Sequence, residues 1–588
     1  MPVAPTYPGV YIEEIPSGVR TIVGVPTSIA AFLGRTISGP VNEPVTINSF
    51  ADFARTFGGL SPDLPMGYAV NDFYQNGGGQ AVIVRLYAGS AANPDAGKAS
   101  IALDGGLKLV ASSPGAWGNS LLASVDTDNI TGEIAAQLGL QPGDLFNLTI
   151  SKLQNGKAVP AERFLNVTVN PGAALPAGRV RLVSNVLQQQ SELVNVSWQL
   201  KSDGTPDYSK VTAPKPTAAA AAASKPAAKS AGAKTAGADD SGGGSNAAAT
   251  TAAHSAATTT APAQVKGFTA PPNLGGADSG PLADSDYLGT DPNGRSGLTS
   301  LETVDIFNLL CIPPDNFVSD IPVEVYQAAM DYCAKRRALL LVDPPSAWSA
   351  NPDNAANGVL SGLPSLSLTG DSARNAALYF PRLIEGDPLS KGQPITMAPC
   401  GAVAGVMART DVQRGVWKAP AGLDASLNNT LGLDVNLTND ENGMLNPLGV
   451  NCLRSFPVSG RVVWGARTLR GADQAADDYK YVPVRRLALF LEESLYRGTQ
   501  WVVFEPNDEP LWASIRLNIG AFMHDLFRQG AFQGSTPTAA YFVKCDSTTT
   551  TQNDINRGIV NVVVGFAPLK PAEFVVLQIQ QIAGDIQT

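Results

Sequence analysis

Residues 202–299 place the strongest constraint on how this 588-residue chain can fold. Their middle, from Ala213 to Gln264, consists mostly of Ala, Ser, Thr, Gly, Pro and Lys. Such a segment cannot bury enough apolar surface to offset the entropy that a chain loses when it becomes ordered. We therefore expect a flexible low-complexity segment at the surface, because a domain core has no room for it. The domains must be built from the sequence on either side.

Strand and helix patterns alternate on both sides of this segment. Apolar runs of strand length recur, and amphipathic or small-residue helix patterns lie between them. The runs with a strand pattern are Ile29–Gly34, Val45–Ile47, Ala81–Leu86, Val304–Pro313, Ala338–Asp343 and Ala376–Phe380. Such alternation is typical of a mostly parallel sheet with helices on both faces. We predict one doubly wound α/β domain that is discontinuous in sequence, built from residues 21–90 and 300–472.

Two further regions differ from this α/β pattern. Residues 91–201 hold short alternating runs separated by Pro, Gly and Asn, which predicts a β-rich insertion domain in the form of a small sandwich or barrel. Residues 473–588 begin with a helix pattern that leads into a strand at Trp501–Phe504. A second helix pattern and three more strand patterns follow. This mixture predicts an α+β domain at the C-terminal end.

Net charge and cysteine content narrow the classes of function. The net charge is −10, and no run of Arg and Lys with interleaved aromatic residues occurs, which argues against a nucleic-acid binder. The five cysteines are scattered and have no CxxC spacing, which predicts free, mostly buried thiols and assembly in a reducing environment. We expect neither a secretory signal peptide nor a membrane-spanning segment.

Enzyme motifs are missing, so we predict no catalytic residue, no cofactor and no metal site. The glycines Gly77–Gly79 precede a strand instead of following one, which predicts a turn and not a phosphate-binding loop. Asp343 ends a predicted parallel strand, where α/β enzymes keep functional residues, but it has no His or Lys partner and Asp-Pro-Pro is an ordinary turn. His524 lies in a helix pattern and is expected on a helix surface or at an interface. Glu492 and Glu493 are adjacent and point to different sides of a helix, so they are poorly placed to act as an acid/base pair.

Both ends of the chain carry strand patterns that have no evident partner nearby. A free arm of ten residues needs a gain of about 10–20 kcal/mol to become ordered. Strand addition to another copy supplies main-chain hydrogen bonds and buried apolar area, and repeated exchange builds an open helical array. The residues that we assign to these intersubunit arms are Val10, Tyr11, Ile12, Glu13, Ile15, Val560, Val562, Val564, Phe574, Val576 and Ile579.

Several motifs follow one another in a specific order along the chain. They are TYPGVYIEEIPSG, IAAFLGRT, NGGGQAVIVRL, PGAWGNSL, RRLALFLEESLYRGTQWVVFEPNDEPLWASIRLNIGAFMHDLFRQGAFQG and AYFVKCDSTTTTQNDINRGIVNVVVGFAPLKPAEFVVLQI. In these motifs the chain resembles the contractile tail sheath proteins of phages, R-type pyocins and bacterial contractile injection systems. The resemblance covers residues 1–90, 110–125 and 300–588, whereas residues 126–300 depart from it.

The resemblance implies a structural subunit and not an enzyme. Copies would form a helical or stacked-ring sheath around an inner tube protein, with baseplate and terminal cap proteins as further partners, without nucleic acid and without insertion into a membrane. Residues 1–20 would form a strand-exchange arm, the α/β core would have a subtilisin-like fold without the protease histidine, and the insertion would face outward. Residues 473–588 would lie innermost, with tube-facing side chains from Arg485, Arg486, Glu493, Arg497, Arg516 and Arg528.

The same resemblance implies assembly in the bacterial cytoplasm, as part of a phage tail or a phage tail-like particle that can be released from the cell. Two alternatives stay open. One is another self-assembling surface or tube protein, although a tube protein would be small and β-rich. The other is an α/β hydrolase that uses Asp343.

Overall fold

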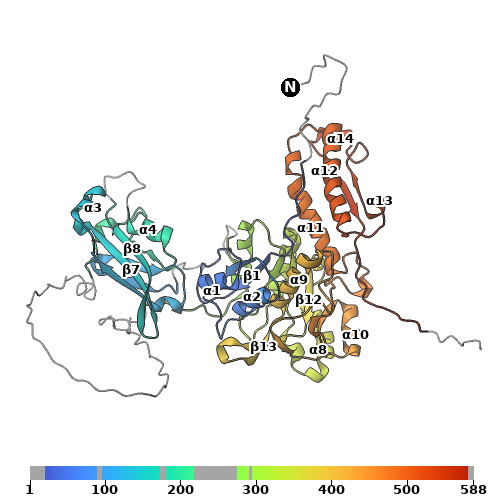
Figure 1. Ribbon diagram of the computed structural model, residues 1–588, viewed down its shortest axis with the longest axis horizontal. Coiled ribbons are helices and arrows are strands. Elements are labelled where there is room, and N and C mark those ends of the chain that lie inside the picture. Colours follow the sequence, from blue (N-terminus) through green and yellow to red (C-terminus); the bar gives the residue numbers. More distant parts are fainter. Residues whose placement is uncertain (1–19, 89–95, 172–180, 217–273, 290–294, 580–588) are drawn as a thin grey trace, which may run out of the picture. The chain divides into compact units, whose positions relative to one another are not determined.

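The computed structural model describes residues 20–88, 96–171, 181–216, 274–289 and 295–579 (Figure 1). The chain divides into two compact units. The first consists of residues Met1–Pro94 and Ser279–Thr588, and the second of Asp95–Asp278. The second unit is therefore an insertion into the first, as the sequence predicts.

An eight-stranded sheet forms the centre of the first unit, and its strand order is β17-β16-β12-β11-β10-β1-β3-β2. All neighbours from β16 to β3 pair in parallel, whereas the edge strands β17 and β2 are antiparallel to their neighbours. The strands are β1 (Ala30–Gly34), β2 (Val45–Ile47), β3 (Ala81–Arg85), β10 (Leu309–Cys311), β11 (Leu339–Val342), β12 (Ala376–Phe380), β16 (Val450–Phe456) and β17 (Gly460–Val463).

Helices cover both faces of this sheet, which confirms the predicted doubly wound arrangement. Because side chains alternate along a strand, Ala31 and Leu33 of β1 face one hydrophobic core and Ala30 and Phe32 face the other. The first core receives α6 (Asp284–Leu288), α7 (Val323–Arg336), α8 (Ala355–Gly362) and α10 (Asn439–Leu445). The second receives α1 (Phe50–Phe57), α2 (Pro65–Gln75) and α9 (Cys400–Arg414).

Small residues let α9 lie very close to α2. A Cβ added at Gly401 would stand 2.1 Å from the carbonyl oxygen of Ala69, and one at Gly405 would stand 2.5 Å from that of Phe73. The small-residue pattern of α9 in the sequence thus serves close packing of this helix against α2. The sequence does not predict the small antiparallel sheet nearby, which consists of β13 (Leu383–Asp387), β14 (Gln393–Met397) and β15 (Thr430–Leu433).

The second unit is β-rich, as predicted. Its two three-stranded sheets contribute to one hydrophobic core, and Figure 1 shows the long strands β7 and β8 side by side. One sheet consists of β4 (Ser100–Ala102), β5 (Lys108–Ala111) and β9 (Val194–Val196), and the other of β6 (Leu121–Asp126), β7 (Leu145–Gln154) and β8 (Lys157–Thr168). The described part of this unit also contains the helices α3 (Gly132–Gln137) and α4 (Val183–Gln190).

The predicted bounds of the low-complexity segment, 202–299, are too wide. Val211 and Leu274 pack into the core of the second unit, and the Ser100 amide donates to the Leu274 carbonyl at 2.8 Å. Tyr287 is only 2% exposed in the core of the first unit. These apolar side chains are single residues among polar ones, so their burial leaves no periodic pattern in the sequence.

The C-terminal elements of the first unit gather around α12, as Figure 1 shows in orange and red. They are α11 (Val482–Gly498), α12 (Glu509–Arg528), α13 (Pro537–Ala540), β18 (Tyr541–Lys544), α14 (Gln552–Asn556) and β19 (Val563–Phe566). The predicted strand at Trp501–Phe504 is wrong. A 3₁₀ turn occupies Gln500–Val502, and Phe504 has a left-handed backbone (φ 70°) and a fully exposed side chain. Periodicity alone does not identify so short an apolar run as a strand.

Candidate functional site: the roots of the two chain ends

An exposed apolar segment, Phe574–Ile579, follows the last strand of the chain. The exposed fractions of its large apolar side chains are Phe574 76%, Val575 79%, Val576 82%, Leu577 82% and Ile579 94%. The segment belongs to no helix or strand in the described part of the chain. Burial of such a side chain contributes about 1.5–3 kcal/mol, so a surface that covers this segment would supply a gain that offsets the cost of ordering it. The predicted arm residues Phe574, Val576 and Ile579 lie in it.

Of the other predicted C-terminal arm residues, Val564 is paired with a strand of its own chain. A role of Val560, Val562 and Val564 between copies stays a prediction. β19 pairs antiparallel with β18, so that Val564 lies opposite Val543. Val560 and Val564 pack against the core formed by α11 and α12, and Val562 is 36% exposed. The strand is therefore an integral part of the C-terminal elements. In the described residues, β18 and β19 form a two-stranded sheet, so each strand has one edge that pairs with no other described strand.

Glu573 fixes the root of the exposed segment to the α/β core. Its carboxylate accepts hydrogen bonds from Nε and Nη2 of Arg467 at 2.8 and 2.6 Å and from the Tyr481 hydroxyl at 3.2 Å. The Arg467 side chain is fully buried. Burial by itself would lower the pKa of Arg467, but the hydrogen bonds and the charge of Glu573 outweigh it and raise the pKa.

Arg467 is itself held rigidly beside β16. Its backbone amide donates to Oδ1 of Asn451, a residue of β16, at 2.6 Å. Its Nη1 donates to the carbonyls of Asn446 and Gly471 at 2.9 and 3.2 Å and to Asp473 at 3.0 Å. The root of the C-terminal segment is thus connected through one side chain to a strand of the large sheet.

The N-terminal root lies on the C-terminal elements. The predicted arm residues Val10–Ile15 lie outside the described residues, which begin at Arg20. The Arg20 amide donates to Asn518 of α12 at 3.0 Å, and Ile22 is buried in the core around α12. The Val25 amide donates to Ser494 of α11 at 3.2 Å. The N-terminal root is therefore anchored on elements that the C-terminal part of the sequence builds. The C-terminal root is anchored on Arg467, next to the large sheet.

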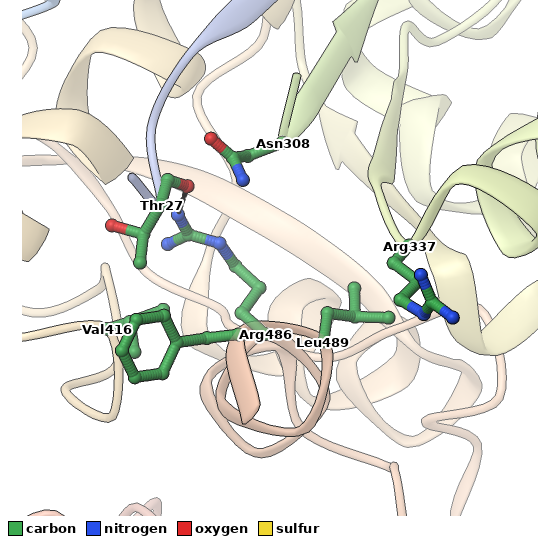
Figure 2. A pocket seen from close by; sticks show the side chains of 7 residues that line it. Thr27, Asn308, Arg337, Val416, Arg486 and Leu489 are labelled. Atoms are coloured by element: carbon green, nitrogen blue, oxygen red, sulfur yellow. Dashed lines mark hydrogen bonds between the residues drawn. The ribbon is translucent and has the colours of Figure 1, made fainter. Parts of the chain in front are cut away.

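A buried ion pair between Arg486 and Asp411 joins α11 to the core. Arg486 extends from α11 toward Thr27 and donates to the Thr27 carbonyl at 2.8 Å (Figure 2). It also pairs with Asp411 of α9 at 2.6 Å. Both charged side chains are 3% exposed. The prediction that Arg486 faces a tube is therefore wrong, because Arg486 is buried together with its hydrophobic neighbours on α11, such as Leu487 and Leu489. The small hollow here is lined by Thr27, Asn308, Arg337, Val416, Arg486, Leu489 and Phe490.

Other predicted tube-facing residues also take part in contacts within the chain. Arg485 donates to Asn375 at 3.0 Å, and Glu493 accepts from Arg337 and Arg497 at 2.8 and 2.7 Å. These bonds attach α11 to the α/β core, and Arg485 and Glu493 are mostly covered, with side chains 13% and 14% exposed.

Three predicted tube-facing residues, Arg497, Arg516 and Arg528, are partly or fully exposed and can still meet a partner. Arg497 pairs with Asp305 at 2.8 Å, and its side chain is 34% exposed. Arg516 pairs with Glu509 at 2.6 Å, and Arg528 is exposed at the end of α12. Their role toward a tube stays a prediction. His524 lies on the exposed side of α12, with Nδ1 3.4 Å from the Tyr541 hydroxyl.

Asp343 has a structural role at the end of β11. Its Oδ1 accepts the backbone amide of Cys400 at 2.9 Å, so it caps the first turn of α9 in place of Pro399, which offers no side-chain acceptor. Burial raises the pKa of Asp343 to about 6, although the hydrogen bonds from Cys400 oppose the shift. Among the described residues no cluster of His, Cys, Asp and Glu could hold a metal ion. No described helix is long and apolar enough to cross a membrane.

Comparison with known proteins places two family domains on this geometry. A family model described as the phage tail sheath protein central domain matches residues 372–469, and one described as the phage tail sheath C-terminal domain matches residues 474–582. The tail sheath protein of Vibrio phage KVP40 is 27% identical over 178 residues, or 30% of this chain. The match spans 25% of the length of that relative.

Solved structures share the fold at low sequence identity. A sheath complex of the extracellular contractile injection system PVC, in its contracted state, is 19% identical with a TM-score of 0.52, and the match covers 100% of this chain and 99% of the other. The crystal structure of a sheath tail protein from Listeria innocua is 13% identical with a TM-score of 0.52, over 93% and 96% of the two chains.

Proposed function

We propose that this chain, a member of the phage tail sheath family through residues 372–469 and 474–582, is a structural subunit of a contractile sheath. Copies assemble as a helical array around an inner tube, and contraction of the array drives the tube through a target envelope. The observation that carries the proposal is the exposed apolar segment Phe574–Ile579, which lies within the matched C-terminal domain. A subunit that works alone has no use for such a segment.

The occupant that covers this segment is a second copy of the chain. Phe574–Ile579 adds as a strand to an outer edge of the neighbour's β18–β19 sheet, together with Val10–Ile15 of a further copy. Ordering of these six residues costs about 6–12 kcal/mol, and burial of five large apolar side chains returns about 8–15 kcal/mol. The two amounts nearly balance. A contact of this kind holds subunits together through its main-chain hydrogen bonds and can still adjust when the array rearranges.

The same proposal assigns roles to the other parts. The α/β core, for which we expect a subtilisin-like fold, supports the array, and the insertion unit faces outward. The C-terminal elements face the tube, with Arg497, Arg516 and Arg528 as candidate contacts. Baseplate and cap proteins end the array, which is assembled in the bacterial cytoplasm as part of a phage tail or tail-like particle. Contraction is a cooperative change between two packings of the same subunit.

Electron microscopy of the purified full-length chain, with and without a candidate tube protein, tests the proposal. We expect hollow tubes with a helical repeat. A chain that ends at Glu573 keeps every contact of the described core and should remain folded but form no tubes. A chain shortened only by residues 580–588 is the matched control and keeps Phe574–Ile579. Ordered tubes from the chain that ends at Glu573 would contradict strand exchange. Flat two-dimensional sheets would indicate a surface-layer protein instead.

A further inference from the structure

We infer that Glu573 anchors the C-terminal segment, so that the free arm begins directly after it. Force that a neighbouring copy exerts on the arm then passes through Glu573 to Arg467 instead of to β19. This inference rests on the proposed function, since it concerns the arm that the sheath would use. It assigns a positioning role to an ion pair that joins residues 106 positions apart in the sequence.

The geometry of the ion pair suits an anchor. The guanidinium of Arg467 holds both carboxylate oxygens of Glu573 through Nε and Nη2, and the Tyr481 hydroxyl adds a third bond. A bidentate pair of this kind fixes direction as well as distance. Because Arg467 is fully buried and makes four further hydrogen bonds, to Asn446, Gly471, Asp473 and Asn451, it cannot follow Glu573 if the arm is pulled.

The chain between β19 and Glu573 shows what the anchor restrains. The Ala567 carbonyl accepts the Gln533 amide at 2.9 Å, and Pro568 lies opposite Phe532. From Lys570 to Ala572, no backbone hydrogen bond holds the chain in the described structure. Without Glu573, the free arm would begin at residue 570 instead of residue 574. The added residues 570–573 would lengthen its reach by up to about 14 Å.

A longer arm would change how neighbouring copies are spaced. Strand addition fixes where the arm ends on the neighbour, and Arg467 fixes where it begins, so the anchor sets the span between the two subunits. If the ion pair served only the stability of its own subunit, its loss would lower the melting temperature and leave the mobility of the arm unchanged. The two possibilities therefore differ in a measurement on the dispersed subunit.

Spin labels on single introduced cysteines measure arm mobility directly. All five native cysteines are buried, so a label attaches selectively to a cysteine at an exposed position. We would label Ala572→Cys, between Pro568 and Glu573, and Leu577→Cys, beyond the anchor. In the otherwise unchanged chain we expect an immobilised spectrum at residue 572 and a mobile one at residue 577. Glu573→Gln should remove the immobilised component at residue 572 and leave residue 577 unchanged.

Matched variants separate the anchor from general effects. Glu302→Gln removes a surface partner of Lys335, 2.8 Å away, and should leave both spectra as they were. Glu573→Asp keeps the charge on a shorter side chain and should restore part of the immobilised component. An unchanged spectrum at residue 572 in Glu573→Gln would overturn the inference.

Assembly gives the second measurement. If the unaltered chain forms no tubes with or without the tube protein, the proposed function fails, whereas the spin-label result on dispersed subunits stands by itself. If the unaltered chain forms tubes, Glu573→Gln should give tubes with a more variable helical repeat and lower resistance to shear. Tubes with the same repeat and the same resistance would overturn the role of Glu573 in passing force.

Discussion

At the residue scale, the buried charge pair between Arg486 and Asp411 decides how firmly α11 is joined to the core. Two charges that are 3% exposed have lost their hydration, and each depends on the other for compensation. Asp411 also accepts the Thr27 hydroxyl at 2.6 Å. The pair therefore connects α9, α11 and the segment that follows the N-terminal root.

Removal of one partner of this pair should be costly. We expect Asp411→Asn to lower the free energy of unfolding by about 3–5 kcal/mol, because it leaves Arg486 buried without a full counter-charge. Arg486→Met in addition should cost less than the sum of the single changes. Urea unfolding of the single and double variants measures this. Glu302→Gln at the surface, the control, should change the free energy by about 0–1 kcal/mol. Additive losses would contradict the coupling.

A second buried group, the carboxyl pair of Asp72 on α2 and Glu385 on β13, makes stability depend on pH. The two residues are 1% and 2% exposed, and Oδ2 of Asp72 and Oε1 of Glu385 are buried without a hydrogen-bond donor among the described residues. Burial raises the pKa of both, and the charge of Asp72 raises the pKa of Glu385 further. A proton shared between the two carboxyl groups is retained by the folded chain after the unfolded chain has released it.

The sign of the pH dependence follows from these raised pKa values. Above the ordinary pKa of 4.5 for Glu385, the unfolded chain loses protons that the folded chain keeps, so this pair lowers stability as pH rises. The slope approaches about 1.4 kcal/mol per pH unit for one such proton. Glu385→Gln imitates the protonated acid and should remove this slope when unfolding is measured from about pH 5 to about pH 9. An unchanged slope would show that the pair is ionised in the folded chain.

At the scale of elements, the close approach of α9 to α2 leaves no room for a side chain. Gly401→Ala should destabilise the chain by about 1–3 kcal/mol, because its Cβ would overlap the Ala69 carbonyl. Gly443→Ala is the matched control in α10, where an added Cβ meets nothing within 4 Å. It should stabilise the chain by about 0.5–1 kcal/mol through helix propensity. Thermal unfolding compares the two, and equal effects would argue against tight packing of α9 on α2.

The elements that the sequence predicts well are the ones with strong local patterns. Ser49 is the N-cap of α1 and accepts the Asp52 amide, which is the role that Ser favours before a helix. The buried strands β1, β3, β11 and β12 are found where the apolar runs predict them. The sequence does not predict the sheet β13–β14–β15, because its buried positions include the acidic residues Glu385 and Asp387, whereas Leu431 is 53% exposed. The apolar residues therefore show no clear period of two.

The candidate site could be predicted only in part. Phe574–Ile579 has a strand pattern in the sequence, and its exposure agrees with a role outside its own subunit. Nothing in the sequence identifies Glu573 as an anchor, because its partner Arg467 is distant in sequence and neither residue belongs to a recognisable motif. The prediction of a tube-facing side chain was wrong for Arg486 for a related reason. A charged residue on an amphipathic helix is usually exposed, and the burial of Arg486 depends on Asp411, which the local sequence cannot reveal.

At the scale of the whole molecule, the insertion leaves and rejoins the first unit at neighbouring points. The Ala88 amide donates to the Ser279 hydroxyl at 2.9 Å, and Arg35 donates to the Ser279 carbonyl at 2.9 Å. The two residues are therefore adjacent in space, although the second unit lies between them in sequence. The eight-stranded sheet receives no strand from the second unit.

Excision of the second unit should leave the first unit folded. We expect a chain in which a short Gly/Ser linker joins Ala88 to Ser279 to unfold in one cooperative transition, because linker closure between adjacent ends costs little. Calorimetry measures that transition, and electron microscopy tests whether tubes still form. Loss of the transition would mean that the second unit is needed for the first to fold.

The anchor at Glu573 also gives the C-terminal elements a closed path. The backbone runs from Arg467 through α11, α12 and β19 and returns to the same arginine, so this stretch is in effect a ring that a single ion pair closes without a covalent bond. A ring cannot be unravelled from its end. Tension applied to the last residues reaches the point of closure before it reaches any helix or strand inside, and the domain keeps its fold as long as that one closure holds.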